Sequence, residues 1–278
     1  MTDYNLFQIE NLEGYIMNNE KKVAIVVGGG QTLGAFLSEG LADAGYRVVV
    51  ADLNGENAQK VAKGINAKQG EGNAIGVQVD AGDEPSVETL ANATDAAFGR
   101  ADVLVYSAGT AKASPIWDFN LNDFDLSVKV NLTGYFLTAK HFSRLMIRDG
   151  IKGRIIQINS KSGKVGSKYN SGYSAAKFGG VGLTQSLALD LADKGITVHS
   201  LMLGNLLKSP MFQSLIPQYA AKLGIPESEV EQVYIDKVPL KRGCDYQDVL
   251  NVLKFYASEE AAYCTGQSIN ITGGQVMF

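Results

Sequence analysis

The residues best suited to chemistry lie between Ser160 and Lys177, in the segment SKSGKVGSKYNSGYSAAK. Tyr173 and Lys177 are four residues apart, a spacing that places both side chains on one face of a helix. A tyrosine hydroxyl has an ordinary pKa of about 10, and a nearby ammonium group lowers the pKa of an acid by about 1–3 units. We therefore expect Lys177 to bring Tyr173 into the range of general acid–base catalysis. Such pairs also occur on solvated helices, so the rest of the chain must show whether an active site surrounds Tyr173 and Lys177.

The elements that would position this pair alternate along the chain. Apolar runs typical of buried parallel strands lie at Val23–Val27, Val48–Ala51, Ala74–Val79, Val103–Tyr106, Ile155–Ile158, Thr197–Leu203 and Ser268–Ile271. Amphipathic helical patterns lie between them at 32–44, 55–69, 84–98, 121–148, 172–194 and 245–257. Strands that alternate with helices in this way predict one doubly wound, Rossmann-type α/β domain with a seven-stranded parallel sheet flanked by helices.

Two segments fall outside this alternation. Residues 205–243 are rich in apolar and aromatic side chains, and long insertions beyond the carboxyl ends of strands commonly cover a ligand. We expect a helical substrate-covering segment there, and a helical pair that packs on its own small cluster is a compatible alternative. Residues 1–20 are polar, and we expect a loosely ordered N-terminal extension before a domain at 21–278. Met17 is an alternative start that would make the first 16 residues dispensable.

Composition excludes several classes of function. The chain has 278 residues, of which 45% are apolar and 19% charged, as is ordinary for a globular protein. A net charge of −4 gives no support for a nucleic-acid partner. No apolar run has the length of about 18–20 residues that a membrane span needs, and the start of the chain lacks the pattern of a signal peptide. Cys244 and Cys264 belong to no Cys/His cluster, so we expect reduced thiols, no metal site and a cytoplasmic protein.

A glycine-rich turn follows the first predicted strand and opens the next helix. It reads GGGQTLG, from Gly28 to Gly34. Glycines at a strand–helix turn let the backbone approach a pyrophosphate, which the helix N-terminus stabilises. The expected cofactor-binding residues of this turn are Gly28, Gln31, Thr32, Leu33 and Gly34.

Asp52 ends the second predicted strand, 24 residues after Gly28. A carboxylate at this place accepts hydrogen bonds from both ribose hydroxyls and repels a 2′-phosphate. The alternative is that Asp52 caps the N-terminus of the next helix. Because the glycine turn lies upstream at the right distance, we favour ribose binding, with NAD rather than NADP as the cofactor.

The combined pattern resembles the short-chain dehydrogenase/reductase family across residues 23–278. Besides the glycine turn, the matching positions are Asp52, Asp80, Ser107, Ala108, Gly109, Asn131, Ser160, Tyr173 and Lys177. Ser160 precedes Tyr173 by 13 residues, the interval between the catalytic serine and tyrosine of that family. Thr32 stands where the family has its middle glycine, and Tyr106-Ser107 where it usually has asparagine before Ala-Gly. We therefore expect a tighter or differently aimed turn and a weaker polar brace after the fourth strand.

The resemblance implies an NAD-dependent oxidoreductase. Tyr173 would carry the proton, and Lys177 would lower its pKa and bond the nicotinamide ribose. Ser160 would bond the reacting oxygen, and Asn131 would interrupt its helix and hold a water for proton relay. Two other roles stay open, since Ser160 could cap a loop and Asn131 could bond backbone within its helix. The remaining cofactor contacts would come from Asp80 and Ala81 at the adenine, and from Ser107, Ala108 and Gly109.

Lysines gather near the catalytic pair. Three lie in the loop between Ser160 and Tyr173, and Lys208 follows the sixth predicted strand. Lysines bind phosphate as point charges, although loop lysines are also commonly just solvated. The resemblance favours the first interpretation, with a sugar-alcohol phosphate as substrate and with Lys161 and Lys208 nearest to the cleft. The expected substrate-binding residues are Ser160, Lys161, Lys164, Lys168, Tyr173 and Lys208.

Two other functions and the oligomeric state stay open at this point. The chain could act on an unphosphorylated polyol or another oxo compound, or it could be a dinucleotide-sensing protein without chemistry. The helical patterns at 121–148 and 172–194 carry wide apolar stripes, which core packing or subunit contacts could explain. These stripes include Phe136, Leu137, Phe142, Leu183, Leu187 and Leu191. The resemblance implies that the two helices pair between subunits of a homotetramer.

Overall fold

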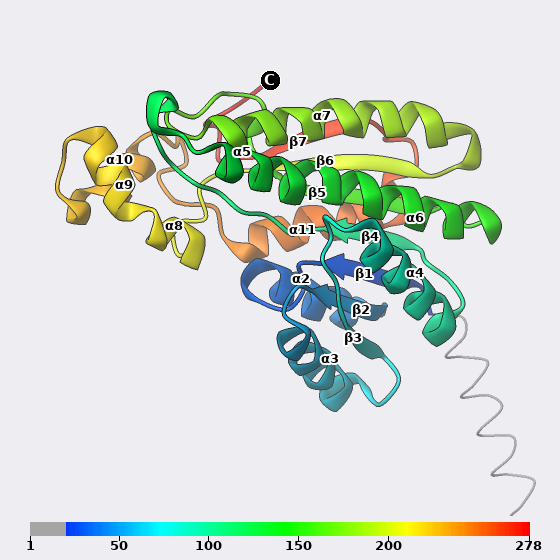
Figure 1. Cartoon of the computed structure of the whole chain (residues 1–278). Helices are drawn as coiled ribbons and strands as arrows, with labels where there is room; N and C mark the ends of the chain where they lie inside the picture. Colours follow the sequence, from blue (N-terminus) through cyan, green and yellow to red (C-terminus); the bar gives the residue numbers. More distant parts are fainter. Residues whose placement is uncertain (1–20) are drawn as a thin grey trace, which may run out of the picture.

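Seven parallel strands form the centre of the fold, in the order β3-β2-β1-β4-β5-β6-β7 (Figure 1). The computed structural model describes residues 21–278, so the expectations for the extension 1–20 lie outside the described residues. The strands are β1 (Val23–Val27), β2 (Arg47–Asp52), β3 (Ala74–Gln78), β4 (Val103–Tyr106), β5 (Arg154–Ser160), β6 (Thr197–Leu203) and β7 (Gln267–Ile271). The predicted doubly wound parallel sheet is therefore confirmed.

Helices cover both faces of this sheet. They are α2 (Thr32–Asp43), α3 (Gly55–Gln69), α4 (Glu84–Phe98), α5 (Leu121–Val128), α6 (Gly134–Arg148), α7 (Ser171–Leu191), α8 (Pro210–Ser214), α9 (Ile216–Leu223), α10 (Glu227–Asp236) and α11 (Tyr246–Ala257). The main departure from the predicted helices is in 121–148, where a π-helical turn η2 (Lys129–Thr133) separates α5 from α6. Among the described helices, none is long and apolar enough to cross a membrane.

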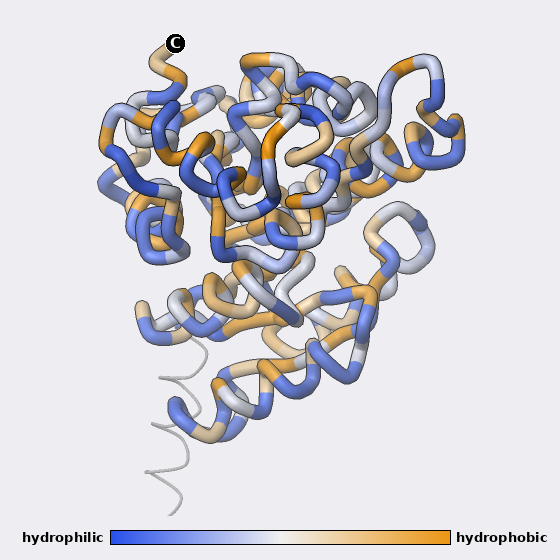
Figure 2. The backbone as a smooth tube through the Cα atoms, turned by 90° about the vertical axis from the view of Figure 1, so that its left-hand side faces the viewer, coloured by the Kyte–Doolittle hydropathy of each residue, from blue (hydrophilic) through white to orange (hydrophobic). Residues whose placement is uncertain are grey.

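The five inner strands, β1, β2, β4, β5 and β6, are buried on both faces, as their continuous apolar sequences predict, whereas the edge strands β3 and β7 are partly exposed. In β1, Val23, Ile25 and Val27 contribute to one core cluster, while Ala24 and Val26 contribute to the other. Helices α4, α6 and α7 pack on the first face, and α2, α3 and α11 pack on the second. Along the helical turns of the chain, hydrophobic and hydrophilic residues lie side by side, as helices with one buried and one exposed face require (Figure 2).

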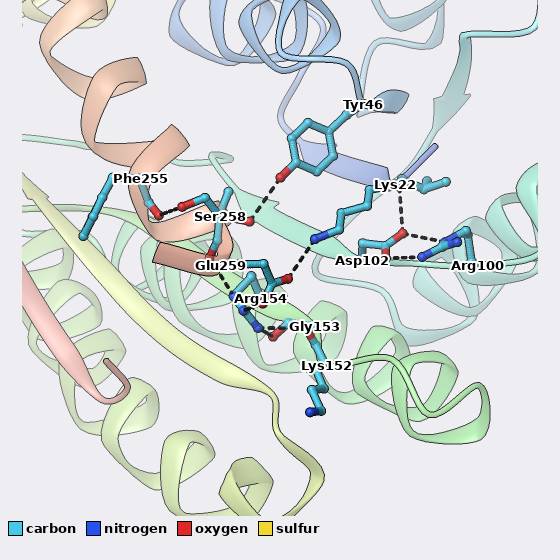
Figure 3. Close-up of polar contacts among 12 residues, drawn as sticks. Lys22, Tyr46, Arg100, Asp102, Lys152, Gly153, Arg154, Phe255, Ser258 and Glu259 are labelled. Carbon is cyan, nitrogen blue, oxygen red and sulfur yellow. Dashed lines mark hydrogen bonds and ion pairs between the residues drawn. The ribbon is translucent and has the colours of Figure 1, made fainter. Parts of the chain in front are cut away.

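Polar contacts tie the amino ends of the strands together (Figure 3). Asp102 accepts a hydrogen bond from the backbone N–H of Val23 at 2.8 Å and pairs with Arg100 at 2.6 Å. Arg154 at the start of β5 pairs with Glu259, just beyond α11, at 3.1 Å. This end of the sheet is thus closed by structural contacts, which leaves the carboxyl ends of the strands as the place for a ligand.

Helices α8, α9 and α10 form the segment expected between 205 and 243 and lie together beyond the sheet (Figure 1). They share a small apolar cluster in which Leu207, Phe212, Ala220 and Val230 are buried. Residues of α8 and α9 also line a cavity at the carboxyl ends of the strands. Both expectations for the segment therefore hold, because it covers the cavity and packs on a cluster of its own.

Core packing explains most of the wide apolar stripes on α6 and α7. Leu137, Phe142 and Leu191 are buried in the core, at most 6% exposed, and Leu183 and Leu187 pack against it. Phe136 is the exception in that set, with 44% of its surface exposed. The six residues are therefore weak evidence for subunit pairing.

Candidate active site

One cavity of about 630 Å³ runs along the carboxyl ends of the strands. It lies where β1 and β4 are neighbours and the strand order reverses, the place where open α/β sheets bind ligands. All the predicted cofactor-binding residues line it: Gly28, Gln31, Thr32, Leu33, Gly34, Asp52, Asp80, Ala81, Ser107, Ala108, Gly109, Tyr173 and Lys177. Ser160 and Lys161 line the same cavity, so residues predicted to bind the cofactor and residues predicted to bind the substrate share one space.

Two glycines of the turn lie so close to neighbouring backbone that no side chain would fit at their positions. A Cβ atom added to Gly28, whose φ is +80°, would lie 2.6 Å from the backbone N of Ala108. A Cβ at Gly34 would lie 1.8 Å from the carbonyl oxygen of Gly28. This close-packed turn at the N-terminus of α2 fits a pyrophosphate, which the backbone must approach closely.

Thr32 adopts the conformation that a glycine would take at its position. Its φ of 49° lies in the left-handed region, which costs a side chain about 1–2 kcal/mol. A hydrogen bond between the side chains of Thr32 and Tyr246 accompanies this conformation. The turn therefore keeps a glycine-like backbone at this position despite the substitution.

Asp52 is held at the end of β2 by backbone hydrogen bonds. Its carboxylate accepts from the N–H of Gly30 at 2.9 Å and of Asn54 at 3.0 Å, and its side chain is only 7% exposed. The cap of α3 is Asn54, so the alternative role of Asp52 as a helix cap is wrong. A second hollow adjoins Asp52, and its described lining contains Asp52 and Glu56 but no lysine or arginine. These residues fit an unphosphorylated adenine ribose.

Asn131 lies in the π-helical turn η2 between α5 and α6, as the expected helix interruption requires. Its amide nitrogen donates to the carbonyl oxygens of Thr110 at 2.8 Å and Ser127 at 2.9 Å. Its Oδ1 is buried and has no partner among the described residues. A Cβ built on Gly109 would lie 3.0 Å from this oxygen and 4.0 Å from Nζ of Lys177. Asn131 thus bonds backbone and also offers a free acceptor that fits a buried water.

Tyr106 braces this turn from the end of β4. Its hydroxyl donates to the carbonyl oxygen of Val130, and the side chain of Gln157 donates to the carbonyl of Asn131 at 3.3 Å. Tyr106 is fully buried, and a Cβ on Gly134 would lie 2.2 Å from its hydroxyl. The expected weakening of the brace is therefore wrong, because tyrosine supplies another polar contact from the position usually held by asparagine.

Strand β5 and helix α7 bring the catalytic candidates together. Ser160 is the last residue of β5, and Tyr173 and Lys177 lie in the first two turns of α7. Nζ of Lys177 is 5.5 Å from the centroid of the Tyr173 ring, so the two share a helix face as predicted. Ser160 lies close enough to Tyr173 to lower the pKa of its hydroxyl, and its Oγ accepts a hydrogen bond from the N–H of Ser162 at 3.1 Å. Ser160 therefore caps its loop and faces the tyrosine at once.

The pKa values of the pair differ from the expectation. Burial raises the pKa of the Tyr173 hydroxyl, and the nearby Ser160 side chain acts in the opposite direction. Burial also lowers the pKa of Lys177 to about 8, and its Nζ donates to the carbonyl of Ile158 at 3.2 Å. The predicted lowering of the Tyr173 pKa by Lys177 is thus wrong, because desolvation penalises the charged form of both groups.

The four lysines predicted to bind substrate lie in different surroundings. Lys161 lines the cavity, and Lys168 lies over the ring of Tyr169 at 4.8 Å on the exposed side of the loop. Lys208 is exposed and is not part of the cavity lining, in contrast to its expected place nearest the cleft. Lys164 also lies outside the lining, because its Nζ donates to the carbonyl oxygens of Ser268 at 2.8 Å and Phe278 at 2.6 Å.

Sequence reasoning missed two tyrosines in the cavity wall and two lysines beside them. Tyr219 of α9 and Tyr234 of α10 line the cavity, with their ring centroids 5.2 Å apart. Nζ of Lys222 lies 5.8 Å from the Tyr219 ring, and Nζ of Lys237 lies 5.1 Å from the Tyr234 ring. The aromatic and basic content of the 205–243 segment was the available sign, but no local spacing indicated which side chains face the cavity.

The described histidines and cysteines lie away from this chemistry. His141 contacts Glu84 at 3.2 Å on α4, and His199 is buried against the ring of Tyr256. Cys244 and Cys264 are free, and burial raises the pKa of Cys244 to about 11. Within residues 21–278, no group of three or more His, Cys, Asp or Glu side chains could hold a metal ion.

Comparison with known proteins identifies the family. Residues 22–220 match the family described as short chain dehydrogenase. The sorbitol-6-phosphate 2-dehydrogenase of Escherichia coli (strain K12) is 73% identical over 257 residues, which cover 92% of this chain and 99% of that protein. The crystal structure of the sorbitol-6-phosphate 2-dehydrogenase from Erwinia amylovora matches with a TM-score of 0.91 and 77% identity, over 92% of this chain and all of that one (100%).

A more distant solved structure shares the architecture. A variant of actinorhodin polyketide ketoreductase, crystallised with NADPH, has 29% identity and a TM-score of 0.88 over 94% of this chain and 99% of its own. This chain therefore shares its overall fold with both solved structures. The chain belongs to the short-chain dehydrogenase family.

Proposed function

We propose that this protein oxidises D-sorbitol 6-phosphate at C2 to D-fructose 6-phosphate with NAD. The observation that carries the substrate is the 73% identity, over nearly the whole length of both chains, to a sorbitol-6-phosphate 2-dehydrogenase. The presence of Ser160, Tyr173 and Lys177 around one cavity supports catalysis over a purely sensing role, which needs no such cluster.

In the proposed reaction, Tyr173 takes the proton of the C2 hydroxyl. Ser160 bonds the same substrate oxygen, and its proximity to Tyr173 favours the phenolate against the effect of burial. Lys177 holds the nicotinamide ribose, and the unpaired Oδ1 of Asn131 holds a water through which the proton leaves. Bound NAD supplies the acceptor for the hydride from C2.

The choice of NAD over NADP rests on Asp52 and its surroundings. The carboxylate is fixed by two backbone N–H groups, and the described lining of the adjoining hollow has no basic side chain that could pair with a 2′-phosphate. A 2′-phosphate placed there would meet the charges of Asp52 and Glu56.

A steady-state assay of NADH absorbance tests the proposal. Purified protein is given D-sorbitol 6-phosphate, D-sorbitol and other polyol phosphates, each with NAD and with NADP. We expect the highest kcat/KM for D-sorbitol 6-phosphate with NAD. A higher kcat/KM for D-sorbitol or for another polyol phosphate would refute the proposed substrate, and a higher value with NADP than with NAD would refute the proposed cofactor. NADH binding without turnover of any sugar phosphate would favour a sensor.

We also propose a homotetramer in the cytoplasm. The support is a set of exposed apolar side chains on α5, α6 and α7: Leu126, Phe136, Ile147, Phe178 and Leu189, each at least 42% exposed. The unpaired Cys244 and Cys264 suit a reducing compartment. Light scattering coupled to gel filtration should give four times the protomer mass of 29.7 kDa, and a monomeric mass would refute the assembly.

A further inference from the structure

Three lysines at or beside the cavity wall have no acidic partner among the described residues. Lys161 lines the cavity, and Lys222 and Lys237 lie outside the lining, over two tyrosine rings that form part of it. Lys161, Lys222 and Lys237 form no ion pair and no side-chain hydrogen bond within residues 21–278. Asp236, which directly precedes Lys237 in the sequence, accepts a hydrogen bond from the side chain of Gln232 at 2.9 Å. Unpaired ammonium groups gathered in one place favour an anion.

The three lysines come from separate parts of the chain but act on one another. The pKa of Lys161 is lowered mainly by burial and, to a smaller extent, by the charges of Lys237 and Lys222. Burial also lowers the pKa of Lys222, to which the charges of Lys237 and then Lys168 contribute. Each group is therefore within electrostatic reach of the others, although the overall charge of the protein is −4.

The aromatic wall places this charge next to the reacting centre. Tyr219 and Tyr234 line the cavity, and the lysines Lys222 and Lys237 lie over their rings at 5.8 and 5.1 Å. The charge of Tyr173 would also act on Tyr219, so these two hydroxyls are close enough to influence each other. An ammonium group over an aromatic face keeps its N–H groups free for an anion.

We propose that Lys222 and Lys237 of the covering segment, together with Lys161, bind the phosphate of the substrate. The inference rests on the proposed function, in which C2 reacts at Tyr173 and the phosphate lies at the other end of the carbon chain. It replaces Lys164 and Lys208 as phosphate ligands and makes α9 and α10 the specificity element. A phosphate dianion would also relieve the mutual repulsion of the lysines.

The test compares the double variant Lys222→Met and Lys237→Met with the wild type in the NAD-bound enzyme. We expect kcat/KM for D-sorbitol 6-phosphate to fall about 100-fold, mainly through KM, because two charged contacts are lost. The rate with D-sorbitol should stay within about twofold, since that substrate has no phosphate. The charge-keeping variant Lys222→Arg should retain most of the activity, and Lys254→Met, at an exposed position of α11, serves as a matched control.

Two outcomes would overturn the inference while the proposed function stands. One is a double variant with wild-type kcat/KM for D-sorbitol 6-phosphate. The other is an equal loss with D-sorbitol, which would mean that the lysines only support the fold.

A second measurement separates this inference from the proposed function. Inorganic phosphate should raise the Tm of the NAD-bound wild type above that in sodium chloride of equal ionic strength, and it should not do so for the double variant. If D-sorbitol 6-phosphate is not oxidised, the proposed function fails, and the rise in Tm with inorganic phosphate becomes the test of the anion site. A wild type whose Tm does not rise with phosphate would then refute the anion site.

Discussion

Replacing Lys177 by methionine should stabilise the protein while abolishing its activity. Lys177 is 3% exposed, and burial lowers its pKa from 10.5 to about 8. At about 1.4 kcal/mol per pKa unit, burial of the ammonium costs about 3 kcal/mol. Methionine fills a similar space without charge but loses the hydrogen bond to Ile158, a loss of about 1 kcal/mol. We expect the variant to be about 2 kcal/mol more stable at pH 7.

The pH dependence of this difference follows from the sign of the shift. The pKa of Lys177 is lower in the folded than in the unfolded protein, so the unfolded chain binds more protons between about pH 8 and pH 10.5. The free energy of unfolding of the wild type therefore rises with pH across this window. The variant lacks this contribution, so its advantage should shrink by about 2 kcal/mol between pH 7 and pH 9.5.

Urea unfolding followed by far-UV circular dichroism measures both effects, at one protomer concentration and without added NAD. Lys254→Met, which removes an exposed lysine from α11, is the matched control and should change stability by less than about 0.5 kcal/mol. A Lys177→Met variant that is less stable than the wild type at pH 7 would refute the reasoning. So would an advantage that stays constant from pH 7 to pH 9.5.

Four further substitutions test the site. Tyr173→Phe should lower kcat by about 10²–10⁴-fold and leave NADH affinity, followed by fluorescence, unchanged; turnover near that of the wild type would contradict its role. Asp52→Ala should lower kcat/KM with NAD about tenfold or more and should reduce the ratio of kcat/KM with NAD to kcat/KM with NADP. An unchanged ratio would show that Asp52 does not recognise the ribose. Tyr106→Phe leaves the Val130 carbonyl without its partner and should lower the free energy of unfolding by about 1–3 kcal/mol; equal stability would show that the brace is dispensable. Lys164→Met should cost about 1 kcal/mol of stability with kcat/KM near that of the wild type, whereas a large loss of kcat/KM would return it to the phosphate site.

Much of the fold could be predicted because its determinants are local. The apolar run Val23–Val27 ends in glycine, and β1 has the predicted bounds. The helices at 55–69 and 84–98 also begin and end where their patterns do. Asn54 and Asp83 cap the N-termini of these two helices, so the residue just before each helix determines where it begins.

The cofactor end of the site was equally accessible from sequence. The residues that follow the carboxyl ends of parallel strands must meet at one edge of the sheet, so Gly28, Asp52, Asp80 and Ser107 had to converge once the strands were recognised. The spacing of Ser160, Tyr173 and Lys177 needed only one strand and one helix to become a cluster.

Electrostatics and the substrate end required the structure. The spacing of Tyr173 and Lys177 says that the two groups are neighbours, but burial, which depends on the whole fold, sets the direction of both pKa shifts. Similarly, the sequence predicted the loss of a polar contact at Tyr106. In the structure, the Tyr106 hydroxyl donates a hydrogen bond to the carbonyl of Val130, which is 24 residues away in the chain.

The sequence by itself determined the class of fold and the places of the glycine turn, of Asp52 and of the cluster of Ser160, Tyr173 and Lys177, because each depends on patterns within one or two adjacent elements. Only the tertiary structure decided which lysines lie in or beside the cavity wall: Lys161 lines the cavity, and Lys222 and Lys237 lie over two tyrosine rings of its lining. Lys161, Lys222 and Lys237 lie far apart in the chain, and they come together because α9 and α10 pack over the carboxyl end of the sheet. No local pattern encodes such long-range packing. It also engages Lys164 with the carbonyl oxygens of Ser268 and Phe278 and leaves Lys208 exposed outside the cavity lining.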